Sequence, residues 1–207
     1  STRKESSAAS DVYKRQALQV LENVAGDTYT VSLAQSINVS IEDEFLPFLY
    51  PNQYVNFHTD SKAVSKGSDL AKDTYSDLDV VQNIYNYVIK NISYDTEKAQ
   101  NVSYGYVPDI DDTLSSKKGI CFDYAALMTS MLRSQNIPTK LEVGYSGDAY
   151  HAWISTYIDD KGWVDDIIQF NGDTWQIMDP TLAATNDSAA VKKYIGDGSH
   201  YVVKYTY

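Results

Sequence analysis

The chain has 207 residues and a formal net charge of −11 at pH 7. This length suits one sizeable domain, or one domain with a smaller extension, and a core of that size needs neither disulfides nor a structural metal. The acidic balance argues against nucleic acid and anionic membrane surfaces as partners, because no basic stripe is present to neutralise phosphates. The sequence also lacks any run of about 18 apolar residues, so no membrane-spanning segment is expected.

The cysteine count and the first residues bear on where the protein acts. Cys121 is the single cysteine, so no internal disulfide can form and cysteine usage does not indicate a redox compartment. The first seven residues are polar and contain neither an initiator methionine nor an apolar signal core, which is typical of a trimmed or mature end. Eighteen tyrosines, with many Asn, Asp, Ser and Thr residues, favour a secreted or cell-surface bacterial protein.

The N-terminal part of the chain is predicted to be an extension with its own secondary structure. Apolar residues recur at helical spacing over residues 11–24, and Gly26 follows as a stop, which predicts an amphipathic helix. Residues 28–41 alternate between apolar and polar, which predicts one or two strands. Two prolines interrupt the apolar run of residues 45–51, which predicts a packed connector.

A domain boundary is predicted in the polar stretch Ser61–Lys72. It separates the extension, residues 1–70, from a core domain, residues 71–207. The core opens with a helix start at Ser76, where a hydroxyl cap is followed three residues later by the acid of Asp79. Apolar residues then follow at i, i+3, i+4 and i+7, which predicts a well-defined amphipathic helix.

The segment Lys98–Ser116 is predicted to be a long polar loop, and a long loop that leads into a reactive helix commonly lines a substrate groove. Its acidic cluster over residues 109–112 would suggest calcium. A hard-cation loop, however, alternates its ligands regularly and has a glycine at the bend, and this cluster has neither. A solvated loop without a metal is therefore predicted.

Cys121 stands at the start of a run, extending to about Gln135, that is apolar around most of its circumference. Such a run predicts a buried helix. At a helix start, unpaired N–H groups and the positive end of the helix dipole favour the nucleophilic thiolate of a cysteine. The alternative is an inert role, because a lone cysteine is most often a small buried apolar residue.

Strands are predicted after this helix, which ends at Ile137-Pro138. Lys140–Tyr145 is the first, and Tyr201–Tyr207 is the last. Between them, His151–Ile158 alternates so that His151 and Trp153 share one face. Taken alone, His151 is better explained as a strand-start histidine satisfied by the backbone.

Three short motifs then occur in a fixed order: Gly119-Ile120-Cys121, His151-Ala152-Trp153 and Asp179-Pro180. In these motifs the chain resembles the transglutaminase-like superfamily, and the resemblance covers roughly the second two-thirds of the sequence. It implies an α+β, papain-like core in which a buried helix carrying the cysteine packs on an antiparallel sheet. Further matches are Asp123-Tyr124-Ala125, Leu132-Arg133, Ile137-Pro138 and Gly144-Tyr145.

The resemblance implies thiol acyl transfer at a Cys-His-Asp triad. Cys121 would attack a carboxamide or peptide carbonyl, His151 would accept and return a proton, and Asp179 would fix the imidazole tautomer. The backbone N–H of Cys121 would be one oxyanion donor. No metal or cofactor is required. The expected substrate-binding neighbours are Tyr94, Tyr104 and Trp153.

The triad requires a particular strand pairing. For Asp179 to reach His151, the strand Trp175–Asp179 must pair directly and antiparallel with His151–Ile158, because a simple meander would place Asp179 at the opposite end of the sheet. Residues 159–173, including Trp163-Val164, would then form an excursion.

Several reactions fit such a core, because one fold supports many functions. A peptidase or amidase that hydrolyses a peptide or protein substrate is favoured, since the chain lacks the extra domains of large crosslinking enzymes. The alternatives are a protein-crosslinking transglutaminase and a non-catalytic module that binds a peptide or glycan. The presence of Cys, His and Asp together argues against the module. The sequence leaves the oligomeric state open.

Overall fold

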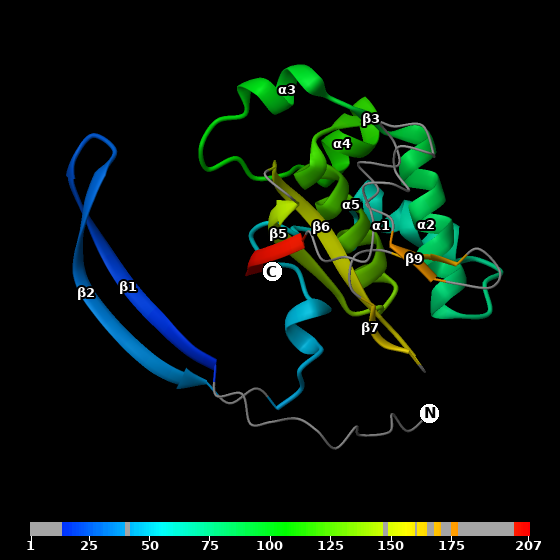
Figure 1. Cartoon of the computed structure of the whole chain (residues 1–207), viewed down its shortest axis with the longest axis horizontal. Helices are drawn as coiled ribbons and strands as arrows, with labels where there is room; N and C mark the ends of the chain where they lie inside the picture. Colours follow the sequence, from blue (N-terminus) through cyan, green and yellow to red (C-terminus); the bar gives the residue numbers. More distant parts are fainter. Residues whose placement is uncertain are drawn as a thin grey trace. The chain divides into compact units, whose positions relative to one another are not determined.

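The computed structural model describes residues 14–39, 42–146, 149–159, 161–164, 168–170, 175–177 and 201–207. Contacts within the chain define two compact units, over residues 1–44 and 45–207. Two long strands belong to the first unit, and the helices and the remaining described strands belong to the second (Figure 1). The compact units divide at residue 44, whereas a domain boundary at residue 70 stays a prediction.

The first unit is an antiparallel hairpin of β1 (Lys14–Ala25) and β2 (Thr28–Val39). The strand prediction for residues 28–41 is confirmed over β2, but the helix predicted over residues 11–24 is wrong where this segment is described. The register shifts at Val20/Leu21 and again at Asn23/Ala25, so the apolar residues of β1 do not keep a strict period of two. In the sequence this broken period looks like helical spacing.

The second unit contains the predicted helices and some that were not predicted. Ser76 caps α2 as expected, since its hydroxyl accepts a hydrogen bond from the Asp79 N–H at 3.2 Å. α5 begins at Cys121, also as expected. In chain order, the helices in the described part of this unit are the short 3-10 helix η1 (Leu46–Phe48), α1 (Lys62–Ala71), α2 (Asp77–Asn91), α3 (Thr96–Asn101), α4 (Ile110–Ser116) and α5 (Cys121–Ser134).

The stretch Ser61–Lys72 forms α1, which corrects the prediction of a polar link. The cap of this helix comes from a distant segment. The Asp111 carboxylate accepts hydrogen bonds from the N–H groups of Lys62 at 3.0 Å and Ala63 at 2.9 Å. α1 packs against α5, and Ala63 is fully buried. The sequence around α1 therefore does not show where this helix begins, because the carboxylate that accepts from its first N–H groups lies in α4.

The segment Lys98–Ser116 was predicted as a loop, but it contains most of α3 and all of α4. Each helix is capped by an aspartate just before it: Asp95 accepts from the Lys98 N–H at 2.9 Å, and Asp109 accepts from the Asp112 N–H at 2.9 Å. Part of the acidic cluster thus serves as a helix cap. Within the described ranges, no group of three or more His, Cys, Asp or Glu side chains is placed to hold a metal ion.

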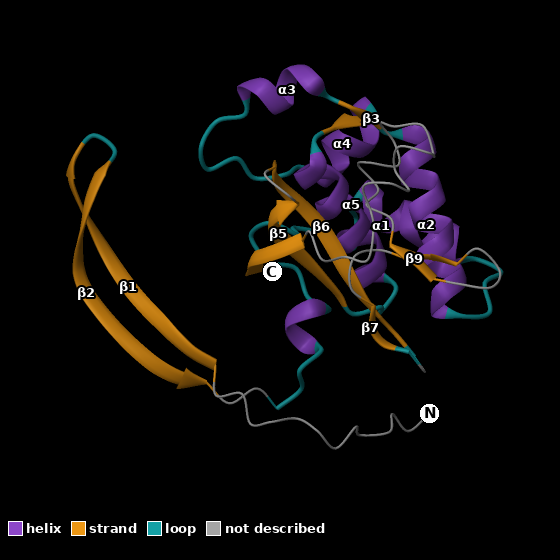
Figure 2. Cartoon of the chain, in the orientation of Figure 1, coloured by secondary structure: helices purple, strands orange, loops and turns teal. Residues whose placement is uncertain are grey.

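The main sheet is four-stranded and antiparallel, in the order β10-β5-β6-β7 (Figure 2). The predicted strands at residues 140–145, 151–158 and 201–207 are confirmed as β5, β6 and β10. A parallel pair, β3 with β4, and an antiparallel pair, β8 with β9, complete the described strands of this unit. Their bounds are β3 (Ser93–Tyr94), β4 (Lys118–Gly119), β5 (Thr139–Ser146), β6 (Ala149–Ile158), β7 (Gly162–Val164), β8 (Ile168–Phe170), β9 (Trp175–Ile177) and β10 (Tyr201–Thr206).

The neighbours of β6 differ from the predicted ones. β6 pairs with β5 along its length and with β7 at Thr156–Ile158, so Trp163-Val164 is not an excursion. β9 pairs with β8 rather than with β6. A tight turn explains the difference, because Gly162 has a φ of +86°, a conformation that glycine adopts readily, and this lets the chain reverse directly after β6.

The core of the second unit surrounds α5, which packs against one face of the sheet and against α1 and α2 (Figures 1 and 2). Leu141 and Val143 of β5, with Ala152 and Ile154 of β6, are buried in the same cluster as the middle of α5. The predicted α+β fold, with a buried cysteine-bearing helix on an antiparallel sheet, is confirmed. In the described part of the chain, no helix has the length and apolar character needed to cross a membrane.

Arg133, in the last turn of α5, connects three segments of the second unit. It is 3% exposed. Its Nε donates to the Thr139 carbonyl at 2.8 Å, and its two Nη atoms donate to the carbonyls of Tyr50 at 2.7 Å and Tyr207 at 2.8 Å. Burial lowers the pKa of Arg133 to about 10, so the side chain stays charged at neutral pH.

Candidate active site

Cys121 is the first residue of α5, and its thiol is partly exposed. The first N–H groups of a helix have no partner within the helix, so the backbone around this thiol presents donors to whatever lies in front of it. The following turns of α5 are buried, from Asp123 to Arg133. The helix therefore holds the thiol at its open end while the rest of it is fixed in the core.

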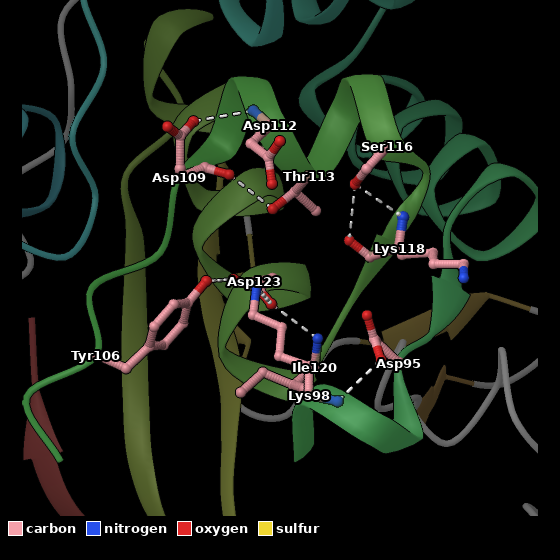
Figure 3. A network of polar contacts seen from close by, with 10 residues as sticks. All are labelled: Asp95, Lys98, Tyr106, Asp109, Asp112, Thr113, Ser116, Lys118, Ile120 and Asp123. Atoms are coloured by element: carbon pink, nitrogen blue, oxygen red, sulfur yellow. Dashed lines mark hydrogen bonds and ion pairs between the residues drawn. The ribbon is translucent and has the colours of Figure 1, made fainter. Parts of the chain in front are cut away.

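A buried carboxylate fixes the start of α5 (Figure 3). Asp123 has no exposed surface. One of its oxygens accepts hydrogen bonds from the Ile120 N–H and from Lys98 Nζ, each at 2.8 Å, and the other accepts from the Tyr106 hydroxyl at 2.5 Å. Lys98 belongs to α3 and Tyr106 to the segment that follows it, so Asp123 joins these residues to the turn that carries Cys121.

The charges and protons of this network are set by its own contacts. Burial opposes the charge on Lys98, but the hydrogen bonds and charges of Asp123 and Tyr106 outweigh it, so the pKa of Lys98 lies above its usual value. Burial, and next the hydrogen bond to Asp123, raise the pKa of Tyr106 to about 12. Lys98 also lies over the Tyr106 ring, 4.5 Å from its centroid. At neutral pH Lys98 is therefore a cation and Tyr106 a neutral phenol.

The turn before Cys121 has room only for a glycine. A Cβ added at Gly119 would lie 2.7 Å from the Asp123 Cβ. β4 is also held from the other side, because the N–H of Asp95 donates to the Gly119 carbonyl at 2.9 Å. The glycine of the Gly-x-Cys motif is thus required by the close approach of the carboxylate that orders the helix start.

His151 lies near the start of β6, opposite Gly144 of β5. Its ring stacks on that of Trp153, with centroids 6.3 Å apart, so the two side chains share a face. Strand alternation places both on the face opposite that of Ala152 and Ile154, which pack in the core with α5. Strand alternation therefore puts His151 and Trp153 on one face of β6 and Ala152 and Ile154 on the other, and the approach of the imidazole to the Cys121 thiol stays a prediction.

Tyr150 of β6 lies near enough to the Cys121 thiol to interact with it electrostatically. Burial is the largest cause that raises the pKa of Tyr150. The charges of Tyr205, Tyr145 and Tyr54 raise this pKa further, and Cys121 makes the smallest contribution. The Tyr150 side chain nevertheless remains 60% exposed. The sequence analysis did not single out this residue. Its signal was the alternation of β6, which puts Tyr150 on the face opposite that of His151.

The other predicted site residues have different surroundings. Tyr94 of β3 is partly exposed, whereas Tyr104 is fully exposed in the segment after α3. Trp153 is 1% exposed, which makes it a core residue in this structure. Asp179 lies outside the described residues, so its role in a triad stays a prediction.

Comparison with known proteins connects this site to a family. A mouse protein, the kyphoscoliosis peptidase, is 30% identical over 45% of this chain and 16% of its own length. The UPF0252 protein MJ1282 of Methanocaldococcus jannaschii is 30% identical over 49% of this chain and 34% of its own length. This chain thus spans about a third or less of the curated relatives it matches.

The chain is also similar to solved structures and to a family model. The periplasmic domain of TgpA from Pseudomonas aeruginosa is 17% identical, with a TM-score of 0.49, over 69% of this chain and 49% of that one. The model of the transglutaminase-like superfamily matches residues 65–165, which include Cys121 and His151. Residues 65–165 of this chain are thus a transglutaminase-like core segment.

Proposed function

We propose that this protein is a cysteine-dependent acyl-transfer enzyme that hydrolyses peptide or carboxamide bonds. Cys121 is the nucleophile, His151 the general base and acid, and Asp179 the carboxylate that orients the imidazole. The observation that carries the proposal is the position of Cys121, a partly exposed thiol at the first residue of a buried helix in a transglutaminase-like core.

The proposed reaction has two steps. The sulfur of Cys121 attacks the carbonyl carbon, and the C–N bond breaks as His151 delivers the proton taken from the thiol to the departing amine. Water then attacks the resulting thioester, which releases the acid and restores the thiol. Backbone donors at the start of α5 face the oxyanion in both steps. The imidazole must come within hydrogen-bond reach of the sulfur in the substrate complex, and catalytic contacts are often looser without substrate.

A peptide-binding module on the same fold is the second candidate. The observation that favours it is the exposed aromatic surface near Cys121, which includes Tyr150 at 60% exposure. Such a module would use the exposed surface near Cys121 without covalent chemistry.

Alkylation by iodoacetamide and digestion of a peptide library separate the two candidates. For an enzyme, we expect Cys121 to be alkylated faster than free cysteine at the same pH, and we expect Cys121→Ala and His151→Ala each to lower cleavage by roughly a thousandfold or more. Both variants should keep the thermal unfolding of the wild type. A thiol no faster than free cysteine, with no cleaved peptide, would establish the module instead.

His58→Ala is the matched control for the histidine variant. The His58 side chain is 65% exposed and is paired with Asp60. We expect this variant to cleave the library at the wild-type rate. An equal loss of activity in His58→Ala and His151→Ala would argue that neither imidazole acts at the thiol.

Crosslinking is distinguished from hydrolysis by the acyl acceptor. The library digest is repeated with an added primary amine, and the products are weighed by mass spectrometry. A hydrolase gives free acids whether or not the amine is present. Products that carry the amine in place of water would identify a transglutaminase.

An extracellular or cell-surface location is part of this proposal. The abundance of tyrosine, together with asparagine, serine and threonine, supports it. Fractionation of the cells that make the protein, followed by immunodetection, tests it. Recovery of the protein with the cytosol would contradict it.

A further inference from the structure

The sheet face that α5 covers continues past the start of the helix as a row of tyrosines. Tyr145 of β5 pairs with Tyr150 of β6, and Tyr205 of β10 pairs with Val143 of β5. Tyr207 exchanges two backbone hydrogen bonds with Leu141, at 2.9 and 2.8 Å. Directly opposed residues of an antiparallel pair project from the same face. These tyrosines therefore share the face from which Leu141 and Val143 reach into the core.

The exposure of this face changes along it. Leu141 and Ile154, under α5, are fully buried. Beyond the helix, the side chains of Tyr145, Tyr150 and Tyr205 are 40%, 60% and 56% exposed. The part of this face that α5 covers thus ends near Cys121, the first residue of the helix. The exposed part of the face beyond it is aromatic.

Ring contacts join this open face to the residue next to the thiol. Phe122 follows Cys121 in α5, and its ring lies 5.6 Å from that of Tyr54. The Tyr54 ring lies 4.5 Å from the Tyr207 ring. The ring of Tyr207 stacks on that of Tyr205 at 6.3 Å, and the rings of Tyr145 and Tyr150 meet edge to face at 5.5 Å. We call the set Tyr54, Tyr145, Tyr150, Tyr205 and Tyr207 the tyrosine platform.

Two tyrosines of the platform, Tyr150 and Tyr207, hold their phenolic protons more tightly than a free tyrosine does. Burial, and next the charge of Tyr54, raise the pKa of Tyr207 to about 12. The pKa of Tyr150 is also raised. The five side chains offer ring faces, ring edges and hydroxyl groups, and they offer no carboxylate or ammonium group to pair with a charged ligand.

We propose that the tyrosine platform binds an aromatic side chain of the peptide substrate beside the bond that Cys121 attacks. This inference rests on the proposed function and adds its substrate class. Aromatic rings pair favourably in offset and edge-to-face geometry, which the platform rings already adopt among themselves. Tyrosine supplies a large contact area with few rotatable bonds. The platform is thus the part of the site that sets specificity.

Two peptide libraries test the platform. They are identical except that one fixed position holds Phe in the first library and Leu in the second. We expect the wild type to prefer the Phe library in kcat/KM, and we expect Tyr150→Ala and Tyr205→Ala to lower the Phe:Leu ratio about tenfold. Tyr150→Phe keeps the ring and should keep the ratio. Unchanged ratios in both alanine variants would overturn the proposal.

Tyr75→Ala is the matched control, because Tyr75 is 97% exposed and lies outside the platform. It should keep the wild-type Phe:Leu ratio. An equal fall of the ratio in Tyr75→Ala and Tyr150→Ala would show a general effect of removing tyrosine rings, and it would also overturn the proposal.

Binding to Cys121→Ala separates a failure of the platform from a failure of the proposed chemistry. Affinities for the two libraries are measured on this variant by fluorescence, which needs no turnover. A Phe preference in binding without turnover by the wild type supports the platform and rejects the proposed enzyme. Turnover without a Phe preference rejects the platform alone. Preferential binding of an N-acetylglucosamine oligomer over both libraries would replace the aromatic peptide by a sugar and overturn the proposal.

Discussion

Asp123 accounts for the order at the start of α5. Three donors converge on one buried carboxylate, and a hydrogen bond to a charged group contributes about 1.5–3 kcal/mol to stability. If one donor is lost, the Asp123 carboxylate lacks a hydrogen-bond partner, and water cannot replace it because Asp123 is buried. The geometry of the turn that carries Cys121 is therefore coupled to the segment that holds Lys98 and Tyr106.

Tyr106→Phe should change how stability depends on pH. The pKa of Tyr106 is about 12 in the folded protein and about 10 in an unfolded chain. Below pH 10 both states keep the proton. Between pH 10 and 12 only the unfolded state loses it, so the contribution of this raised pKa is lost in that window. We expect the unfolding free energy of the wild type to fall more steeply from pH 10 to 12 than that of Tyr106→Phe.

Urea denaturation at pH 7, 10 and 12 measures this difference. At pH 7 the variant should be less stable by about 1.5–3 kcal/mol, because Asp123 loses a donor. Tyr75→Phe serves as the control, since that side chain is 97% exposed, and it should follow the wild type. Parallel curves for the wild type and Tyr106→Phe from pH 10 to 12 would contradict the role given to this hydroxyl.

Whether the role of a single residue could be predicted from the sequence depended on how far its partners lie from it along the chain. Cys121 and its helix start were predicted from adjacent residues. The function of Asp123 was not, because its partners Lys98 and Tyr106 lie 25 and 17 residues earlier. The face of His151 followed from alternation, but the position of α5 relative to that face required the packed structure.

At the level of the elements, β10 passes close to β5 at Gly144. A Cβ at Gly144 would lie 2.0 Å from the Val202 carbonyl oxygen. That oxygen belongs to the backbone, so a side chain at position 144 can be accommodated only if β10 moves. Gly144 therefore sets how closely β10 approaches β5, and with it where Tyr205 of the platform stands.

Gly144→Ala should loosen β10. We expect a loss of about 1–3 kcal/mol in unfolding free energy, the usual cost of overpacking, and faster hydrogen exchange in β10 than in α2. Gly105→Ala is the control, because Gly105 has no atom within 4 Å of its added Cβ, although its φ of +79° strains the loop locally. Exchange in β10 should be unchanged in this control. Unchanged exchange in Gly144→Ala would show that the strand tolerates the added methyl group.

Elements with local signals were predicted, and those with distant partners were not. The signals of the predicted elements lie in their own residues: start signals and helical spacing for α2 and α5, and the sequence pattern of a strand for β5 and β6. α1 was missed because Asp111 caps it from another helix. β1 was mistaken for a helix because two register shifts interrupt its alternation. The pairing of β9 was mispredicted because a geometric requirement of the triad was used to choose its neighbour.

For the molecule as a whole, the two units differ in how much they bury. The hairpin of residues 14–39 leaves large apolar side chains half exposed, including Leu18 at 54%, Leu21 at 54% and Tyr29 at 57%. A two-stranded hairpin is marginally stable on its own. The second unit has a continuous core around α5, which is the source of cooperative stability in a domain of this size.

Removal of residues 1–44 should leave the second unit folded. We expect the protein of residues 45–207 to unfold in a single cooperative transition, with a melting temperature within about 4 °C of that of the full chain. Calorimetry measures this temperature, and circular dichroism at 20 °C checks the helical content. A truncated protein that is unfolded at that temperature would show that the core depends on the hairpin.

The three hydrogen bonds of Arg133 bear on which substitutions the second unit can accept. Its guanidinium recognises only main-chain oxygens at positions 50, 139 and 207, so it is indifferent to which side chains stand there. Lysine cannot replace it, because an ammonium lacks the planar fork that reaches several separate acceptors. Changes of side chain at these three positions therefore leave the three hydrogen bonds in place, provided that Arg133 is kept.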